Sequence, residues 1–234
     1  MNFAAKTAIV TGAAGNLGRA IAAAFEGLGA NTVLLARTKE SLAAAIGPET
    51  DRRLFVAADL LDQAALDSAV RLVRQRFGRI DVLCNIAGGF RMGSPVHETP
   101  DKDWDFLLDI NARTLLHAVR AVVPQMLEGG GGKIINVGAF AAQKGAAQMG
   151  AYTASKGTVI RMTEAMAGEL RDKNINVNCV LPTIIDTPEN RAAMPKADPS
   201  RWVAPEDLAN VIVFLASEEA RAIHGAALPV TGLS

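Results

Sequence analysis

The chain has 234 residues, of which half are hydrophobic, and its 24 basic side chains balance 24 acidic ones to give a formal net charge of zero. This length suits one large α/β domain, and the apolar fraction is sufficient for an extensive core. A neutral chain without a basic block lacks the attraction that a phosphate backbone requires, so nucleic acid is excluded as the expected partner.

Cysteine and histidine are too sparse to suggest a metal site. Cys84 and Cys179 lie in separate apolar runs, and the three histidines are scattered. Metal ligands cluster at characteristic spacings, so we expect no metal, and two buried thiols suit a reducing compartment. No apolar stretch approaches the roughly twenty residues that span a bilayer, and no secretory leader precedes the first strand-like run. We therefore expect a cytoplasmic protein with no membrane partner.

The first half of the chain alternates short apolar runs, rich in β-branched residues, with helical patterns. The first run ends at a glycine-rich turn, and the helix that follows it ends near Leu28. Alternation of this kind predicts βαβ units. The expected strands are 6–11, 31–36, 54–58 and 81–84. The other expected helices are one that follows Lys39 and ends at about Ile46, and one over 62–77.

The second half continues the alternation with longer helices. We expect helices over about 101–128, 152–171 and 205–216, and strands at 134–137, 175–181 and 226–230. Residues 183–203 show neither pattern and contain several prolines. This segment is therefore expected to be an irregular substrate loop.

Nearly continuous apolar strands that alternate with helices predict an α/β fold. Such strands are buried on both sides, which implies a single doubly wound parallel sheet of the Rossmann type with helices on both faces. We expect one domain over residues 1–234, because the sequence shows no repeat and no linker. In such sheets the ligand crevice lies beyond the carboxyl ends of the strands, and the polar and glycine clusters of this chain follow its strands there.

Residues 11–18 form a glycine-rich turn between the first strand and the first helix. Glycines at 12, 15 and 18 allow a tight turn and the close approach of a ligand, and the start of the helix directs free N–H groups toward it. A pyrophosphate fits this arrangement, although such a turn also packs a helix on a strand without any ligand.

The end of the second strand bears on the choice of dinucleotide. Ala36 stands where an NAD enzyme usually has an acid, and Arg37 and Thr38 follow it. A cation with a hydroxyl group suits a 2′-phosphate, so we favour NADP(H), with NAD(H) as the alternative.

Residues 152–156 read Tyr-Thr-Ala-Ser-Lys. On a helix, Tyr152 and Lys156 project from one face. A neighbouring ammonium favours the phenolate, so we expect Lys156 to lower the pKa of Tyr152 toward the range that suits a general acid. The same spacing is common on solvated helix faces, so its function depends on the residues around it.

Together these segments resemble the short-chain dehydrogenase/reductase family over essentially the whole chain. The family's Thr-Gly-x-x-x-Gly-x-Gly turn corresponds to residues 11–18, although Asn16 replaces a glycine and Gly15 lies one position early. Residues 85–88 are similar to its Asn-Asn-Ala-Gly element, and its Pro-Gly-x-x-x-Thr segment corresponds to residues 182–187.

The resemblance implies roles for individual residues. Tyr152 would donate a proton, Lys156 would lower its pKa and bind the nicotinamide ribose, and Asn111 would hold a relay water. The implied cofactor-binding residues are Gly12, Gly15, Asn16, Leu17, Gly18, Arg37, Thr38, Asp59, Leu60, Asn85, Ala87, Gly88, Tyr152, Lys156, Pro182 and Thr187. The family assembles through its long helices, so a homotetramer or homodimer is expected.

The family's catalytic serine is missing from this chain. It usually precedes the tyrosine by thirteen residues, a position held here by Ala139, and no Ser or Thr lies between Lys133 and Tyr152. Loss of one donor to the substrate oxygen typically costs about 10²–10³ in rate. This serine-less segment and the loop over residues 181–202 resemble quinonoid dihydropteridine reductase, whose conjugated imine substrate depends less on that donor.

We therefore expect an NAD(P)H-dependent oxidoreductase that transfers hydride to a small molecule, either a carbonyl compound or a conjugated, pterin-like imine. Phe90, Met149, Met194 and Trp202 are expected to be substrate walls or core residues. One alternative is a ketone or 3-oxoacyl reductase in which water replaces the missing serine. The other is an NADP-binding protein that has lost most or all of its turnover.

Overall fold

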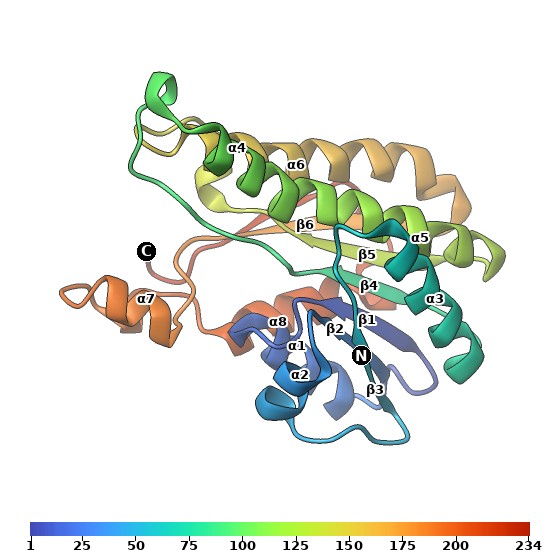
Figure 1. The fold of residues 1–234 in the computed structure, drawn as a ribbon. Coiled ribbons are helices and arrows are strands. Elements are labelled where there is room, and N and C mark those ends of the chain that lie inside the picture. The colour runs from blue at the N-terminus through green and yellow to red at the C-terminus, as the bar shows by residue number, and fades with distance from the viewer.

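A seven-stranded parallel sheet forms the centre of the computed structural model, which describes residues 1–234 (Figure 1). The strand order is β3-β2-β1-β4-β5-β6-β7, so the chain starts in the middle, builds one edge and then crosses to build the other half. This is the doubly wound, Rossmann-type arrangement expected from the sequence. The strands are β1 Thr7–Thr11, β2 Asn31–Ala36, β3 Arg53–Ala57, β4 Val82–Asn85, β5 Gly132–Val137, β6 Ile175–Pro182 and β7 Ala227–Val230.

Helices cover both faces of the sheet (Figure 1). One face is covered by α1 Asn16–Gly27, α2 Lys39–Ile46 and α8 Pro205–Leu215, and the other by α3 Gln63–Phe77, α5 Thr114–Glu128 and α6 Gly150–Leu170. Helix α4 Asp101–Leu108 packs against α6, and the short helix α7 Pro188–Ala193 projects from the body of the molecule. No helix combines the length and the hydropathy needed to cross a membrane.

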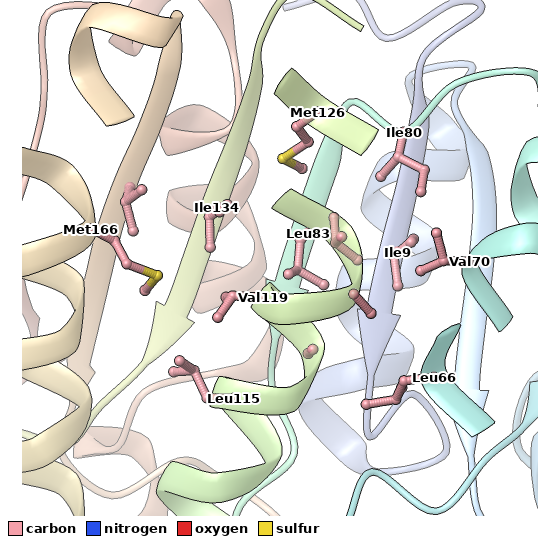
Figure 2. Close-up of a cluster of buried hydrophobic side chains, with 14 of the residues drawn as sticks. Ile9, Leu66, Val70, Ile80, Leu83, Leu115, Val119, Met126, Ile134 and Met166 are labelled. Atoms are coloured by element: carbon pink, nitrogen blue, oxygen red, sulfur yellow. The ribbon is translucent and has the colours of Figure 1, made fainter. Parts of the chain in front are cut away.

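Successive strand residues contribute to two separate cores, because a strand directs its side chains alternately to opposite faces. In β1, Ile9 joins the core beneath α3, α5 and α6, whereas Ala8 and Val10 join the core beneath α1 and α8. Figure 2 shows the first core, where Leu83 of β4 lies beside Val119 of α5. Burial on both faces explains why the strands read as continuous apolar runs.

Strand and helix boundaries mostly agree with the expected ones to within two residues, and two segments differ. The expected helix 101–128 contains a π-helical turn, Asp109–Arg113, between α4 and α5. The expected irregular segment 183–203 contains α7, which begins where the Thr187 hydroxyl accepts from the Asn190 amide at 3.2 Å. A helix of six residues is too short to show a helical period in the sequence, so it was missed.

Candidate active site

The glycine turn after β1 has the shape of an anion cradle. Gly12 has a left-handed φ of +64°, and a Cβ there would lie 3.0 Å from the backbone of Ala87. A Cβ on Gly18 would lie 2.5 Å from the Gly12 carbonyl oxygen, so α1 packs closely on the turn. Gly15 is the N-cap of α1, and the amides of residues 16–18 have no backbone acceptor. Three free donors at the positive end of a helix fit a pyrophosphate.

Thr11 joins this turn to the end of β4. Its hydroxyl accepts from the amides of Ile86 at 2.9 Å and Ala87 at 3.2 Å, and it donates to the Cys84 carbonyl at 3.4 Å. These bonds hold the predicted cofactor residues 85–88 against the glycine turn. Thr11 was not among the predicted site residues, although it is the first residue of the Thr-Gly-x-x-x-Gly-x-Gly turn.

Asn85 belongs to a buried amide network beneath the site. Its Nδ2 donates to Asn136 Oδ1 at 2.9 Å, and Asn136 Nδ2 donates to Thr163 Oγ1 at 2.8 Å, so β4, β5 and α6 are tied together. Asn85 Oδ1 is buried and has no partner, which is unusual for a polar atom in a folded chain. Asn136 and Thr163 were not predicted, because they stand within apolar patterns that give them no separate signal.

The Tyr152 side chain stands in the first turn of α6 beside an aromatic neighbour. Its ring meets the Phe90 ring edge to face, with centroids 4.8 Å apart. Burial raises the pKa of Tyr152 to about 12. This direction is opposite to the expected lowering by Lys156. The spacing of the two residues along a helix carried no information about burial, and burial of the phenol is the larger effect.

Lys156 is buried at the same end of the sheet, with 6% of its surface exposed. Its Nζ donates to the Val137 carbonyl at 2.8 Å, and it forms no ion pair with a carboxylate. Burial lowers the pKa of Lys156 to about 8, and the nearby Cys179 thiol opposes that shift. An ammonium group has three N–H donors, so two of them are available to a ligand.

Asn111 lies in the π-helical turn and is buried. Its amide accepts from the Gly89 N–H at 2.9 Å, donates to the Gly89 carbonyl at 3.0 Å and donates to Ser155 Oγ at 3.0 Å. A Cβ on Gly88 would lie 3.0 Å from Asn111 Oδ1 and 3.1 Å from Lys156 Nζ. The fold therefore brings Gly88, Asn111 and Lys156 together.

Ala139 occupies the position of the missing hydroxyl. It directly follows Gly138 at the end of β5, is 5% exposed and begins a single 3-10 turn, Phe140–Gln143, that packs on α6. No residue between Gly138 and Tyr152 carries a hydroxyl group. This part of the site consequently offers a methyl group where a second donor to a substrate oxygen was expected.

The ends of β2 and β3 carry the predicted adenosine-side residues. Arg37 is exposed and takes part in no hydrogen bond or ion pair, so its guanidinium is free. The Thr38 hydroxyl instead caps α2 by accepting from the Ser41 amide at 3.2 Å. Asp59 is exposed after β3 and is followed by the half-buried Leu60.

A long-range contact links the glycine turn to the segment after β6. Asn16 Nδ2 donates to Glu189 Oε2 in α7 at 2.8 Å, and Arg19 donates to Asn16 Oδ1. This contact draws the segment that begins at Pro182 and includes Thr187 toward the start of α1. The amide of Asn16, at a position where a glycine was expected, is responsible for the link.

The four expected wall residues differ in their surroundings. Phe90 contacts Tyr152, and Met149 and Met194 are half-buried. Trp202 is only 8% exposed, so it serves packing and not a substrate wall in this arrangement.

Comparison with known proteins connects this site to a family. The sequence pattern of the short chain dehydrogenase family matches residues 6–198. The chain is 36% identical to D-threitol dehydrogenase of Mycolicibacterium smegmatis, over 97% of this chain and 92% of the relative.

Two solved structures extend the comparison to the fold. Carveol dehydrogenase of Mycobacterium avium in complex with NAD superposes with a TM-score of 0.88 at 30% identity, over 98% of this chain and 97% of that one. L-Sorbose reductase of Gluconobacter frateurii, complexed with NADPH and L-sorbose, superposes with a TM-score of 0.87 at 30% identity, over 99% and 97% of the two chains.

Proposed function

The chain belongs to the short-chain dehydrogenase/reductase family of NAD(P)-dependent oxidoreductases, which act on alcohols and ketones, and we propose that Tyr152, Lys156 and Asn111 form its active site. The observation that carries the proposal is the buried ammonium group of Lys156. It lies beside the backbone of Gly88, donates to one carbonyl group and has no carboxylate partner. We propose that residues 1–234 act as one catalytic domain.

Tyr152 Oη holds the proton that a substrate oxygen receives during reduction, and it accepts that proton during oxidation. Because its pKa is raised to about 12, the phenol is protonated at neutral pH and has a proton to donate. Lys156 uses its two available donors to bind the hydroxyl groups of the nicotinamide ribose. Asn111 fixes the backbone at Gly88 and Gly89 around this group.

A bound nicotinamide dinucleotide supplies or accepts the hydride, and the chain has a suitable cradle for it. The three free amides at the start of α1 would bind the pyrophosphate, and the close contact between Gly12 and Ala87 leaves no room for a side chain there. Asp59, Leu60 and residues 85–88 would line the adenosine side and the middle of the cofactor. Pro182 and Thr187 would lie at the nicotinamide end.

We propose a preference for NADP(H) over NAD(H). The guanidinium of Arg37 is exposed and unpaired, so it is available to a 2′-phosphate. The Thr38 hydroxyl already caps α2, which leaves Arg37 as the main determinant of this preference.

A second candidate substrate is a conjugated imine of the pterin type. Buried Ala139 favours it, because hydride addition to such a ring spreads the developing charge and depends less on a hydroxyl donor. For an ordinary ketone or 3-oxoacyl substrate, a water would have to take the place of that hydroxyl.

We also propose that the enzyme is a homotetramer or homodimer that assembles through the helices α4 to α6. Trp104 and Phe106 expose apolar surface on α4, which a second copy would cover. Cys84 and Cys179 are free and buried, in keeping with the cytoplasmic location that we propose.

Replacement of Tyr152 by Phe tests the proposed function. The variant should lose about 10³-fold or more in turnover of its best ketone, alcohol or quinonoid pterin, because the proton donor is gone. Its affinity for NADPH, measured by fluorescence titration, should stay within about threefold of the wild type, since the phenol contributes little to binding.

Retained turnover would show that another group is the acid. Tight NADPH binding by the wild type without turnover of any of these substrates would favour the non-enzymatic alternative.

A further inference from the structure

A row of exposed apolar side chains borders the start of α6. Phe90, Met92 and Val96 are 56%, 57% and 75% exposed, although each is a large hydrophobic residue. The segment that carries them is held against α6. The Gly93 amide donates to the Gln148 carbonyl at 2.9 Å, and a Cβ on Gly150 would lie 2.6 Å from Val96. This segment therefore lies against the residues that directly precede Tyr152.

Phe90 makes the row continuous with the active site. One side of its ring packs on the Tyr152 ring, and more than half of its surface remains open. The backbone of the preceding residue, Gly89, is fixed on both sides by the Asn111 amide, so the position of Phe90 is set by the site itself.

The turn after β5 adds further apolar side chains next to α6. Ala139 replaces the expected hydroxyl, and Phe140 is 41% exposed in the turn that packs on α6. The charged residue of the row, Arg91, pairs with Asp103 and stacks over the Phe106 ring at 3.9 Å. Its guanidinium is thus already engaged by Asp103 and by the Phe106 ring.

We propose that the preferred substrates carry a flat apolar group, aromatic or alicyclic, on the reacting carbon. This substrate class rests on the proposed function. Such a group covers the open part of the Phe90 ring and removes apolar surface from water. A polyol fits poorly, because hydroxyl groups that lose their water against Phe90 and Ala139 find no partners there.

Paired substrates test this class. For the wild type with NADP⁺, kcat/KM for 1-phenylethanol should exceed that for D-threitol by on the order of 100-fold. Phe90→Ala should raise KM for 1-phenylethanol about 10-fold, and it should lower kcat/KM for 1-phenylethanol about 10-fold more than it lowers kcat/KM for 2-propanol. Phe214→Ala is the matched control, since Phe214 is 39% exposed on α8 at the other face of the sheet. It should change none of these values.

Equal or better turnover of the polyol would overturn the substrate class. An equal loss on 1-phenylethanol and 2-propanol in Phe90→Ala would also overturn it, because Phe90 would then act only by supporting Tyr152. Failure of the proposed function looks different: the wild type would turn over none of the three alcohols while it still binds NADPH.

Discussion

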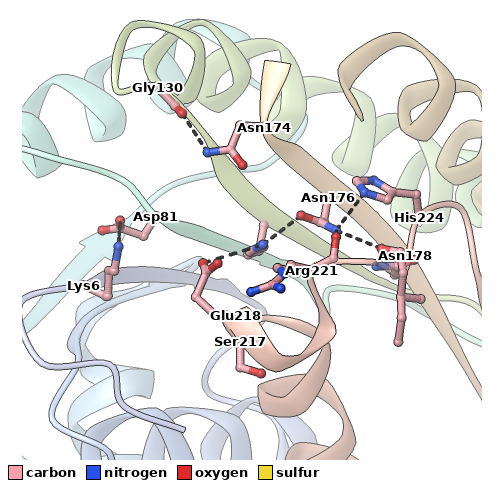
Figure 3. Close-up of polar contacts among 12 residues, drawn as sticks. Lys6, Asp81, Gly130, Asn174, Asn176, Asn178, Ser217, Glu218, Arg221 and His224 are labelled. Carbon is pink, nitrogen blue, oxygen red and sulfur yellow. Dashed lines mark hydrogen bonds and ion pairs between the residues drawn. The ribbon is translucent and has the colours of Figure 1, made fainter. Parts of the chain in front are cut away.

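Two lysines, Lys133 and Lys156, lie near opposite ends of the sheet and leave the same fraction of their surface exposed, 6% each, although Lys133 lines a polar cavity. Lys133, at the amino end of β5, has polar partners. Its Nζ donates to Asn176 Oδ1 at 2.8 Å and lies 3.7 Å from Glu218 Oε1. Figure 3 shows Asn176 and Glu218 in this region, which borders a polar cavity of about 110 Å³.

Lys156 has fewer polar partners to offset the cost of burying its charge, although its exposed fraction is the same. Its partner is the Val137 carbonyl, whereas an acidic side chain opposes the fall in pKa that burial causes at Lys133. A buried charge without a counter-charge is costly, and such groups concentrate at functional sites. The difference teaches that burial alone does not identify the active lysine. The active lysine is better identified by the number of its N–H donors that have no partner within the protein.

Matched replacements should separate the two lysines most strongly. Lys156→Met should lower turnover by about 10³-fold, because it removes the donors to the ribose. Lys133→Met should stay within about twofold of the wild-type turnover and should lower the free energy of unfolding by about 1 kcal/mol through the lost bond to Asn176. Steady-state kinetics and denaturant unfolding of both variants measure this contrast.

Glu218 is exposed, so Lys133→Met leaves no buried charge unpaired. A turnover loss of similar size in both variants would erase the proposed distinction between the two ends of the sheet.

A smaller effect is expected when a hydroxyl donor is introduced at Ala139, after the carboxyl end of β5. Ala139→Ser should raise kcat for ketone reduction by about 10- to 100-fold, since one oxyanion donor is worth that much or more. Ala141→Ser, two residues further along the same turn, is the control and should have no effect. An unchanged or lower rate in Ala139→Ser would mean that the substrate does not use a second donor, which favours the conjugated imine.

Most of the fold could be predicted because its signals are local. The continuous apolar strands and the glycine turn predicted the doubly wound sheet. They also predicted that the candidate site lies at the carboxyl ends of the strands. Helix α7 was not predicted, because it depends on one cap at Thr187 and is too short for a period. The contact of Asn16 with Glu189 joins residues 173 positions apart, and no local pattern encodes such a contact.

For the candidate site, the structure brings some of the predicted residues together, and it corrects one expected electrostatic effect. Lys156, Asn111 and Gly88 lie close together, and their shared role in catalysis remains a proposal. The direction of the Tyr152 pKa was wrong, because an i, i+4 spacing describes neighbours on a helix and not the solvent that reaches them. Burial of Trp202 was likewise invisible in a segment without periodicity.

The claim that Lys156 is buried without a counter-charge is tested most directly by the pH dependence of the free energy of unfolding, compared between the wild type and Lys156→Met without cofactor. Because the pKa of Lys156 is about 8 in the folded chain and 10.5 ordinarily, the unfolded chain binds more protons between these values. Wild-type stability should therefore rise with pH across this window, relative to the variant, by up to about 3 kcal/mol. A difference between the two proteins that does not change with pH would contradict the account.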